Sequence, residues 1–203
     1  MKKIYPIYVV FFAMFTACSQ SYEEPKYELL KSYSPFEVRQ YGGYLEASVT
    51  VDSSFDKAGS EAFPILFDYI SGENLSQQEI NMTAPVIQES EGVKIKMTAR
   101  VTQESDGGTY RVAFVMPSKW TLETLPKPTD SRIMIEEKAP SKVAVIGYSG
   151  TWSTSNYDEH LAQLQDWIKK ENLSPLSSPV WARYNSPFSL WFMRRNEIQI
   201  EVQ

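Results

Sequence analysis

An apolar run that ends in two guanidinium groups stands near the end of the chain. Leu190–Met193, with the sequence LWFM, leads directly into Arg194 and Arg195, and the alternating segment Glu197–Val202 follows. An apolar surface edged by guanidinium groups suits a flat hydrophobic ligand that carries acid groups, because guanidinium matches carboxylate in charge and geometry. The same run also suits a core strand that ends in a salt bridge. Both interpretations stay open on these residues alone.

The residue types that nucleophilic and metal-dependent enzymes require are scarce. His160 is the only histidine and Cys18 the only cysteine among 203 residues. Ser-His-Asp and Cys-His catalysis need a base beside the nucleophile, and a zinc site needs several His or Cys ligands. The glycine-containing segment 71–77 lacks the lysine of a phosphate-binding loop. Several glutamates lie in or near expected strands and leave a carboxylate-driven hydrolase open, but no spacing favours one. We predict a binding module without a metal site, not an enzyme.

The first 17 residues have the composition of an export signal. Lys2 and Lys3 precede an apolar stretch, Ile4–Phe15, that is too short to span a bilayer comfortably, and Ala17 stands before Cys18. The pattern resembles a bacterial lipoprotein signal, in which cleavage precedes the cysteine and its sulfur is lipidated. A simple secretory signal with an incidental cysteine is the alternative.

The expected mature chain is acidic and divides into a membrane tether, residues 18–26, and a folded domain, residues 27–203. Loss of two lysines with residues 1–17 lowers the basic side chains from 20 to 18 against 25 acidic ones, a net charge near −7. An acidic chain without a lysine-rich run argues against nucleic acid as a partner. Ser19 after the cysteine favours the outer membrane, so we expect a lipid-anchored protein on the periplasmic face of a bacterial membrane. A lone cysteine forms no internal disulfide, so the fold depends on its core.

Strand-like alternation and one helical stretch occur twice in the same order. The first helix is expected from Ser54 to about Ser71, with Gly72 as the residue that ends it. Two such β-β-α-β-β units predict an α+β domain in which duplicated β-α-β units form a distorted antiparallel β-barrel or sheet flanked by two helices. The expected strands lie at 27–41 (with a turn at Ser34–Pro35), 44–51, 80–89, 93–103, 109–117, 131–140, 142–150, 180–185 and 197–202, and the second helix lies at 155–173.

The two helices differ in the width of their apolar faces. The second has a single stripe that includes Leu164 and Ile168, as expected of a helix that covers a sheet. The first helix has two apolar stripes. One consists of Ala58, Ala62, Ile65 and Tyr69, and the other consists of larger residues. The second stripe predicts either a ligand site or a surface that a loop covers. It consists of Phe55, Gly59, Phe63, Phe67 and Ile70.

Several separated motifs resemble those of the SOUL haem-binding family. They are INMTAPV at 80–86, FVMPSKWTLETLPKPTD at 114–130, RYNSPF at 183–188 and RRNEIQI at 194–200. The resemblance extends from YELLKSYSPFEVRQYGGYLEA at 27–47 to the end of the chain. It implies a duplicated β-α-β fold and binding of haem or another tetrapyrrole.

The resemblance also implies where a tetrapyrrole would bind. Carried over by position, the site follows the first helix and the closing RRNE motif, with Phe63, Phe67 and Ile70 against the macrocycle and Met193 beside it. Arg194 or Arg195 would meet the propionates, unless the Arg-Arg-Asn-Glu stretch is structural and Arg195 bonds to Glu197. Gln40 stands where one branch of the family has a histidine, so haem would bind without a dedicated axial ligand.

We therefore expect a membrane-tethered periplasmic lipoprotein that binds haem or another porphyrin without catalysing a reaction. Two alternatives use the same apolar stripe. One is a module of the cell envelope that binds another protein, and the other is a site for a different apolar small molecule.

Overall fold

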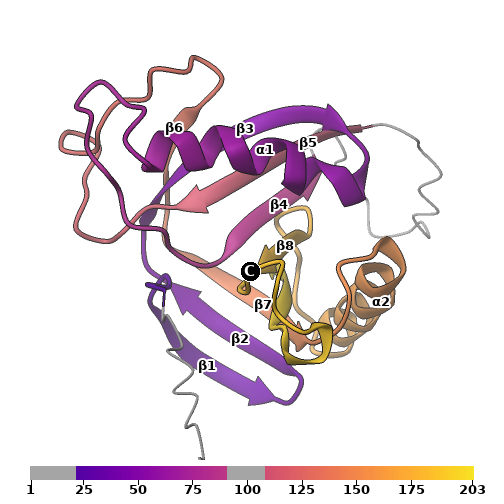
Figure 1. The fold of residues 1–203 in the computed structure, drawn as a ribbon. Coiled ribbons are helices and arrows are strands. Elements are labelled where there is room, and N and C mark those ends of the chain that lie inside the picture. Colours follow the sequence, from indigo (N-terminus) through magenta and orange to yellow (C-terminus); the bar gives the residue numbers. More distant parts are fainter. Residues whose placement is uncertain (1–21, 91–107) are drawn as a thin grey trace, which may run out of the picture.

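The computed structural model describes residues 22–90 and 108–203 (Figure 1). The expected signal segment, Cys18 and the strand expected at 93–103 lie outside the described residues. Within those residues, no helix has the length and apolar composition needed to cross a membrane.

The described chain forms nine strands and two α-helices in the order that the sequence predicts. Nearly every expected strand has an observed counterpart, and the first helix begins and ends where its signals stand, with Ser54 at its start and Gly72 at a φ of 110° after its end. The elements are β1 (Tyr27–Tyr33), β2 (Phe36–Tyr41), β3 (Tyr44–Ser53), α1 (Phe55–Ile70), β4 (Val86–Ser90), β5 (Gly108–Val115), β6 (Met134–Lys138), β7 (Ser141–Tyr148), α2 (Thr154–Lys170), β8 (Val180–Arg183), the short 3-10 helix Trp191–Met193 and β9 (Asn196–Glu201).

The strands form one antiparallel sheet in the order β1-β2-β7-β9-β8-β4-β5-β3-β6. Apart from β1, the order is symmetric. Each strand of the first unit has a counterpart in the second at the mirrored place in the sheet: β2 corresponds to β6, β3 to β7, β4 to β8 and β5 to β9. The predicted duplication is therefore confirmed. Each unit also places its first strand beside the other unit, because β2 pairs with β7 and β6 pairs with β3. The sheet does not close into a barrel, and β1 and β6 are its edges.

Both helices cover the same face of the sheet, one over each half (Figure 1). α1 packs on β3 and β5 through Ala58, Ala62, Leu66 and Tyr69, which are almost completely buried. α2 packs on β7 and β9 through Leu164 and Ile168. The helices meet at their N-terminal ends, where the rings of Phe55 and Tyr157 lie 4.8 Å apart.

The opposite face of the sheet carries buried charged side chains. Arg39 and Glu197 form one buried ion pair, and Arg111 and Glu46 form another. At most 8% of each of these four residues is exposed. The two larger apolar clusters therefore lie between the sheet and the helices, while the other face combines buried ion pairs with two smaller apolar clusters.

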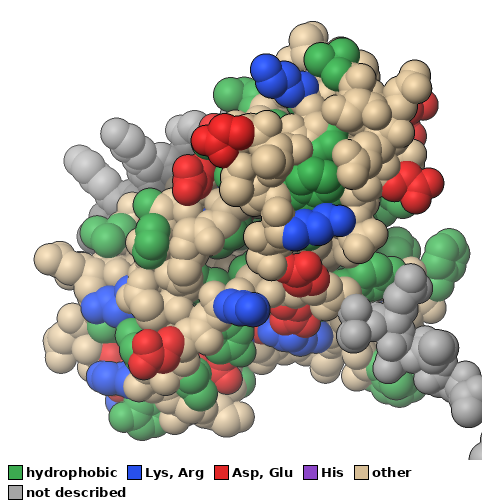
Figure 2. Space-filling model, turned by 90° about the vertical axis from the view of Figure 1, so that its left-hand side faces the viewer, with side chains coloured by type: hydrophobic (Ala, Val, Ile, Leu, Met, Phe, Trp, Pro, Cys, Tyr) green, Lys and Arg blue, Asp and Glu red, His purple; other side chains and the backbone are tan. Residues whose placement is uncertain are grey.

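Charged side chains on the outside are mixed in sign. Figure 2 shows the left-hand side of the view in Figure 1, where Lys and Arg side chains alternate with Asp and Glu side chains. No continuous basic surface is visible on this face.

One expected strand is shorter than predicted, and one of the two open interpretations of Leu190–Met193 is excluded. The strand expected at 80–89 begins only at Val86, because Pro85 has no N–H to donate to a sheet ladder. Leu190–Met193 is not a strand: it forms a turn of 3-10 helix in the long connection between β8 and β9.

Candidate functional site

The larger apolar stripe of α1 is only partly covered. The rings of Phe63 and Phe67 stack with centroids 5.7 Å apart, and Phe63 also contacts Phe114 of β5. Phe63 is partly buried, whereas 46% of Phe67 is exposed. We call these two rings the aromatic surface of α1. An exposed pair of stacked rings offers a flat apolar contact for a ligand.

The rest of this stripe faces inward. Ile70, which the sequence places in the site, is 4% exposed and belongs to the core cluster under α1. Phe55 stacks on Trp181 of β8, with ring centroids 5.0 Å apart. Gly59 is buried against the sheet. The accessible part of the stripe is therefore limited to Phe63 and Phe67.

Arg183 lies under α1 at Gly59. A Cβ atom on Gly59 would stand 2.2 Å from Nη2 of Arg183, so the absence of a side chain at this position makes room for the guanidinium. Nη2 donates a hydrogen bond of 3.1 Å to the amide oxygen of Gln88. The guanidinium also lies 4.8 Å from the ring centroid of Trp181 and 5.3 Å from that of Trp152. Burial lowers the pKa of Arg183 to about 10, which leaves it protonated at neutral pH.

Arg183 differs from most other arginines in what it binds. Its Nε is buried and has no hydrogen-bond partner within residues 22–90 and 108–203, and no carboxylate of those residues forms an ion pair with it. A buried donor without an acceptor is costly and uncommon in folded proteins. Arg183 is not among the site residues predicted from the sequence. Two features of the sequence could have indicated it. Alternation in VWAR places Arg183 on the same sheet face as Trp181, and Gly59 leaves a gap in an otherwise apolar stripe of α1.

The connection between β8 and β9 carries an exposed apolar segment. Met193 is 67% exposed and Phe188 is 96% exposed, and Leu190, Trp191 and Phe192 are exposed as well. Arg194 lies behind them: it donates to the carbonyl oxygens of Pro187 and Ser189 and stacks over Trp152 at 4.3 Å. Arg194 therefore holds its own loop together.

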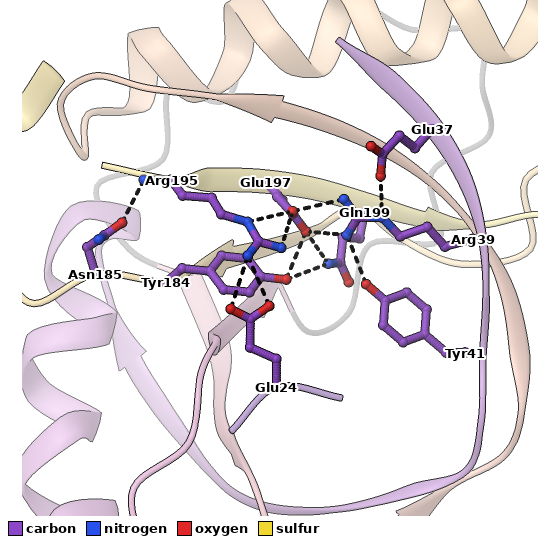
Figure 3. Close-up of polar contacts among 9 residues, drawn as sticks. All are labelled: Glu24, Glu37, Arg39, Tyr41, Tyr184, Asn185, Arg195, Glu197 and Gln199. Atoms are coloured by element: carbon purple, nitrogen blue, oxygen red, sulfur yellow. Dashed lines mark hydrogen bonds and ion pairs between the residues drawn. The ribbon is translucent and has the colours of Figure 1, made fainter. Parts of the chain in front are cut away.

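Arg195 belongs to a network of ion pairs at the start of β9 (Figure 3). Its guanidinium donates to both oxygens of Glu24, at 3.0 and 2.9 Å, and to Oε1 of Glu197, at 3.0 and 2.9 Å. Glu197 also accepts two hydrogen bonds from Arg39, at 2.8 and 3.0 Å. The structural interpretation of the Arg-Arg-Asn-Glu stretch, in which Arg195 bonds to Glu197, agrees with these contacts.

Trp152 connects the two segments that the sequence placed in one site. The centroid of its ring lies 5.3 Å from the guanidinium of Arg183 and 4.3 Å from that of Arg194. Gly59 of α1 contacts Arg183 from the other side. The α1 stripe and the 187–194 segment are thus linked through Arg183 and Trp152, whereas Arg195 lies in the separate ion-pair network.

Ligands for an iron atom are few at this place. Nδ1 of His160 lies 2.7 Å from the carbonyl oxygen of Asn156, and its ring stacks on Tyr148 at 4.1 Å. Gln40 lies on β2 and donates to the carbonyl oxygen of Tyr41, in the half of the sheet that α2 covers. In the described ranges, no group of three or more His, Cys, Asp or Glu side chains is placed to hold a metal ion.

A cavity lies away from the aromatic surface of α1. A cavity of about 420 Å³ opens between the N-terminal segment, the start of β3 and the proline-rich connection. Glu23, Tyr44, Trp120 and Leu122 are among the residues that line it. This cavity is the rival location for an apolar ligand.

Fold and site together define an α+β domain with an accessible aromatic surface on α1 and a guanidinium group one turn away at Gly59. The family model "SOUL heme-binding protein" matches residues 22–201. The chain belongs to this family, as its motifs predict.

Relatives of known name support the same assignment. The chain is 29% identical over 195 residues to "Heme-binding protein 2" of Homo sapiens, a match that covers 89% of this chain and 90% of the human protein. It is 26% identical over 164 residues to "Heme-binding protein 1" of Xenopus tropicalis, with 80% of this chain and 81% of the frog protein covered. Both relatives are named as binding proteins and not as enzymes.

A solved structure shows the same fold at low identity. The C-terminal domain of EcmrR superposes with a TM-score of 0.60 and 10% identity, over 87% of this chain and 98% of that domain. At this identity the likeness concerns the fold alone.

Proposed function

We propose that this protein binds haem or another tetrapyrrole without catalysing a reaction, with the aromatic surface of α1 as the contact for the macrocycle. The observation that carries the proposal is the stacked pair Phe63 and Phe67, partly exposed, in a chain of the SOUL heme-binding family. A flat conjugated ring buries apolar area on such rings and stacks with them. The names of the curated relatives support the same ligand class.

The residues beside this surface fit a porphyrin better than they fit its iron. Ring faces and a guanidinium group suit an apolar macrocycle with acid groups. No histidine or cysteine of the described chain stands free beside Phe67, and Met193 offers only an exposed thioether. We therefore infer weak binding without a dedicated axial ligand from the protein, so that binding depends on contact with the ring.

The experiment is a titration of the purified protein with haemin and, in parallel, with metal-free protoporphyrin. We expect a saturable shift of the absorption band at one equivalent of haemin and an affinity for protoporphyrin within about threefold of it, since iron ligation contributes little. Much weaker binding of the metal-free ring would show that an axial ligand is present. Binding of neither compound would favour the protein-binding or other small-molecule alternatives.

The cellular location is also part of the proposal. We infer that Cys18 is lipidated and that the domain is tethered on the periplasmic side of a bacterial membrane. Ser19, the residue after the cysteine, favours the outer membrane. The composition of residues 1–17 supports this inference. The mixed surface charges in Figure 2 and the net acidic composition support the absence of a nucleic-acid partner.

A further inference from the structure

We propose that Arg183 is the residue that receives an acid group of the ligand bound on the aromatic surface of α1. The inference rests on the proposed function and adds to it the residue that selects for a carboxylate-bearing ring. It also moves that role away from Arg194 and Arg195, one of which would meet the propionates if the family resemblance were carried over by position.

The partners of the described arginines leave this role to Arg183. Arg39, Arg111, Arg132 and Arg195 each bond to at least one carboxylate, and Arg194 bonds to two carbonyl oxygens of its own loop. Arg183 donates to the neutral amide oxygen of Gln88, and its buried Nε has no acceptor within the described ranges. A guanidinium carries five donors in a planar fork, so a carboxylate can bond to it without displacing Gln88.

The surroundings of Arg183 strengthen a bond to an anion. Trp181 and Trp152 lie against the guanidinium and keep most water away from it, yet the side chain as a whole is neither buried nor fully exposed. A charge-assisted hydrogen bond is stronger in such partly desolvated surroundings than at an open surface. The two indole rings also hold the guanidinium plane in place, so little side-chain entropy is lost when an anion binds.

The position of Arg183 suits one end of a flat ligand. Gly59, Phe63 and Phe67 succeed one another at intervals of four residues on α1, so the two rings lie about 6 Å and about 12 Å along the helix from the guanidinium. A planar molecule about a nanometre across, with an acid group at its rim, spans this distance. That description fits a porphyrin with propionate side chains.

Two substitutions test the role of Arg183 in different ways. Arg183→Gln removes the charge and keeps a polar group of similar reach. Gly59→Ala leaves the arginine in the sequence but places a Cβ atom where its guanidinium lies, so the flexible end of Arg183 must move. Alanine also favours the helix more than glycine does, so this variant keeps α1 intact. Arg132→Gln serves as the matched control, because Arg132 is exposed and pairs with Asp130, which is not a partner of Arg183.

The measurement is the dissociation constant for haemin and for haemin dimethyl ester, whose propionates carry no charge. We expect the wild-type protein and Arg132→Gln to bind the acid about ten- to a hundredfold more tightly than the ester. Arg183→Gln and Gly59→Ala should bind both forms with the affinity that the wild type shows for the ester. Thermal melting of each variant checks that the fold is retained, and the loss of preference is a readout that general destabilisation does not produce.

The outcomes separate this inference from the proposed function. If the wild type binds acid and ester equally, or if both variants keep the preference for the acid, Arg183 does not receive the acid group and tetrapyrrole binding still stands. If the wild type binds neither form, the proposed function fails and this inference fails with it.

Discussion

At the scale of single residues, Glu197 holds together the charged face of the sheet. Its carboxylate accepts hydrogen bonds from Arg39, from Arg195, from the Tyr184 hydroxyl at 2.8 Å and from the Gln199 amide at 2.9 Å (Figure 3). Glu197 is 1% exposed. Burial alone would raise the pKa of its carboxyl group, but the hydrogen bonds and charges of Arg39 and Arg195 lower this pKa below its ordinary value.

Replacement of Glu197 by glutamine should destabilise the fold by about 3 kcal/mol, because Arg39 would keep a buried charge with less compensation. Urea denaturation of the purified variant measures this loss as a lower free energy of unfolding. Glu159→Gln, at an exposed position on α2, is the control and should change the free energy of unfolding by less than about 0.5 kcal/mol. Equal stability of the Glu197 variant and the wild type would show that the network contributes no net stability.

The same carboxyl group makes stability dependent on pH. Because the folded pKa of Glu197 lies below the unfolded value of 4.5, its contribution is fully present above pH 4.5 and is lost as the pH falls through the folded pKa. The wild-type free energy of unfolding should therefore decrease below about pH 4.5, and that of Glu197→Gln should decrease less steeply there. Parallel curves for the two proteins would assign the acid sensitivity to other carboxylates.

At the scale of elements, local signals predicted the helices well and predicted long-range contacts poorly. Ser54 and Gly72 stand at the two ends of α1, where Gly72 supplies a positive φ and the side chain of Ser54 makes no capping hydrogen bond. The strand expected at 80–89 begins six residues later than predicted, because Pro85 has no N–H to donate to a sheet ladder. The run Leu190–Met193 has the composition of a strand but lies in an exposed connection, since its neighbour Arg194 bonds to the carbonyls of that loop.

Only those residues of the candidate site that lie at regular spacing along one helix could be predicted from the sequence. Phe63 and Phe67 follow from spacing along one helix, whereas Arg183 requires knowledge that β8 passes beneath Gly59. The partner of Arg195 was equally out of reach, because Glu24 lies 171 residues earlier in the chain. Contacts between distant elements depend on the order of strands in the sheet, which periodicity does not determine.

The two stripes of α1 should respond differently to a new charge. Phe67→Glu should abolish porphyrin binding with little change in the melting temperature, because Phe67 is 46% exposed and the carboxylate can reach water. Ala62→Glu should destabilise the fold by several kcal/mol, about 3 or more, because Ala62 is fully buried and a carboxylate at this position would be removed from water. Haemin titration and thermal melting of the same samples measure both effects.

Leu122→Glu provides the matched comparison for Phe67→Glu. Leu122 is 49% exposed and lines the cavity of about 420 Å³ near the proline-rich connection. The substitution Leu122→Glu should leave porphyrin binding unchanged. Loss of binding in Leu122→Glu with retention in Phe67→Glu would place the ligand in that cavity, and unfolding of Phe67→Glu would assign the aromatic surface to the core.

At the scale of the whole molecule, hydrogen bonds of Glu23 and Glu24 hold the N-terminal segment against the domain, beside the β8–β9 connection. The carbonyl oxygen of Glu23 accepts a hydrogen bond from the N–H of Ala84, and its carboxylate accepts one from the N–H of Ser118 at 2.8 Å. Glu24 binds Arg195, the residue at which the connection joins β9. Cys18 stands six residues before Glu24, a reach of about 20 Å when extended. A lipid on Cys18 would thus hold this side of the domain near the membrane.

If Cys18 carries the lipid, Cys18→Ser should move the protein from the detergent phase to the aqueous phase in detergent partitioning. Haemin binding by the purified variant should be unchanged, because the aromatic surface of α1 does not involve the tether. The exposed residues Phe188 and Trp191 provide a second apolar route to a membrane, so the same assay is run on Cys18→Ser combined with Phe188→Ser and Trp191→Ser. Partitioning into detergent that survives Cys18→Ser and is lost only in the combined variant would assign membrane binding to the β8–β9 connection instead of a lipid.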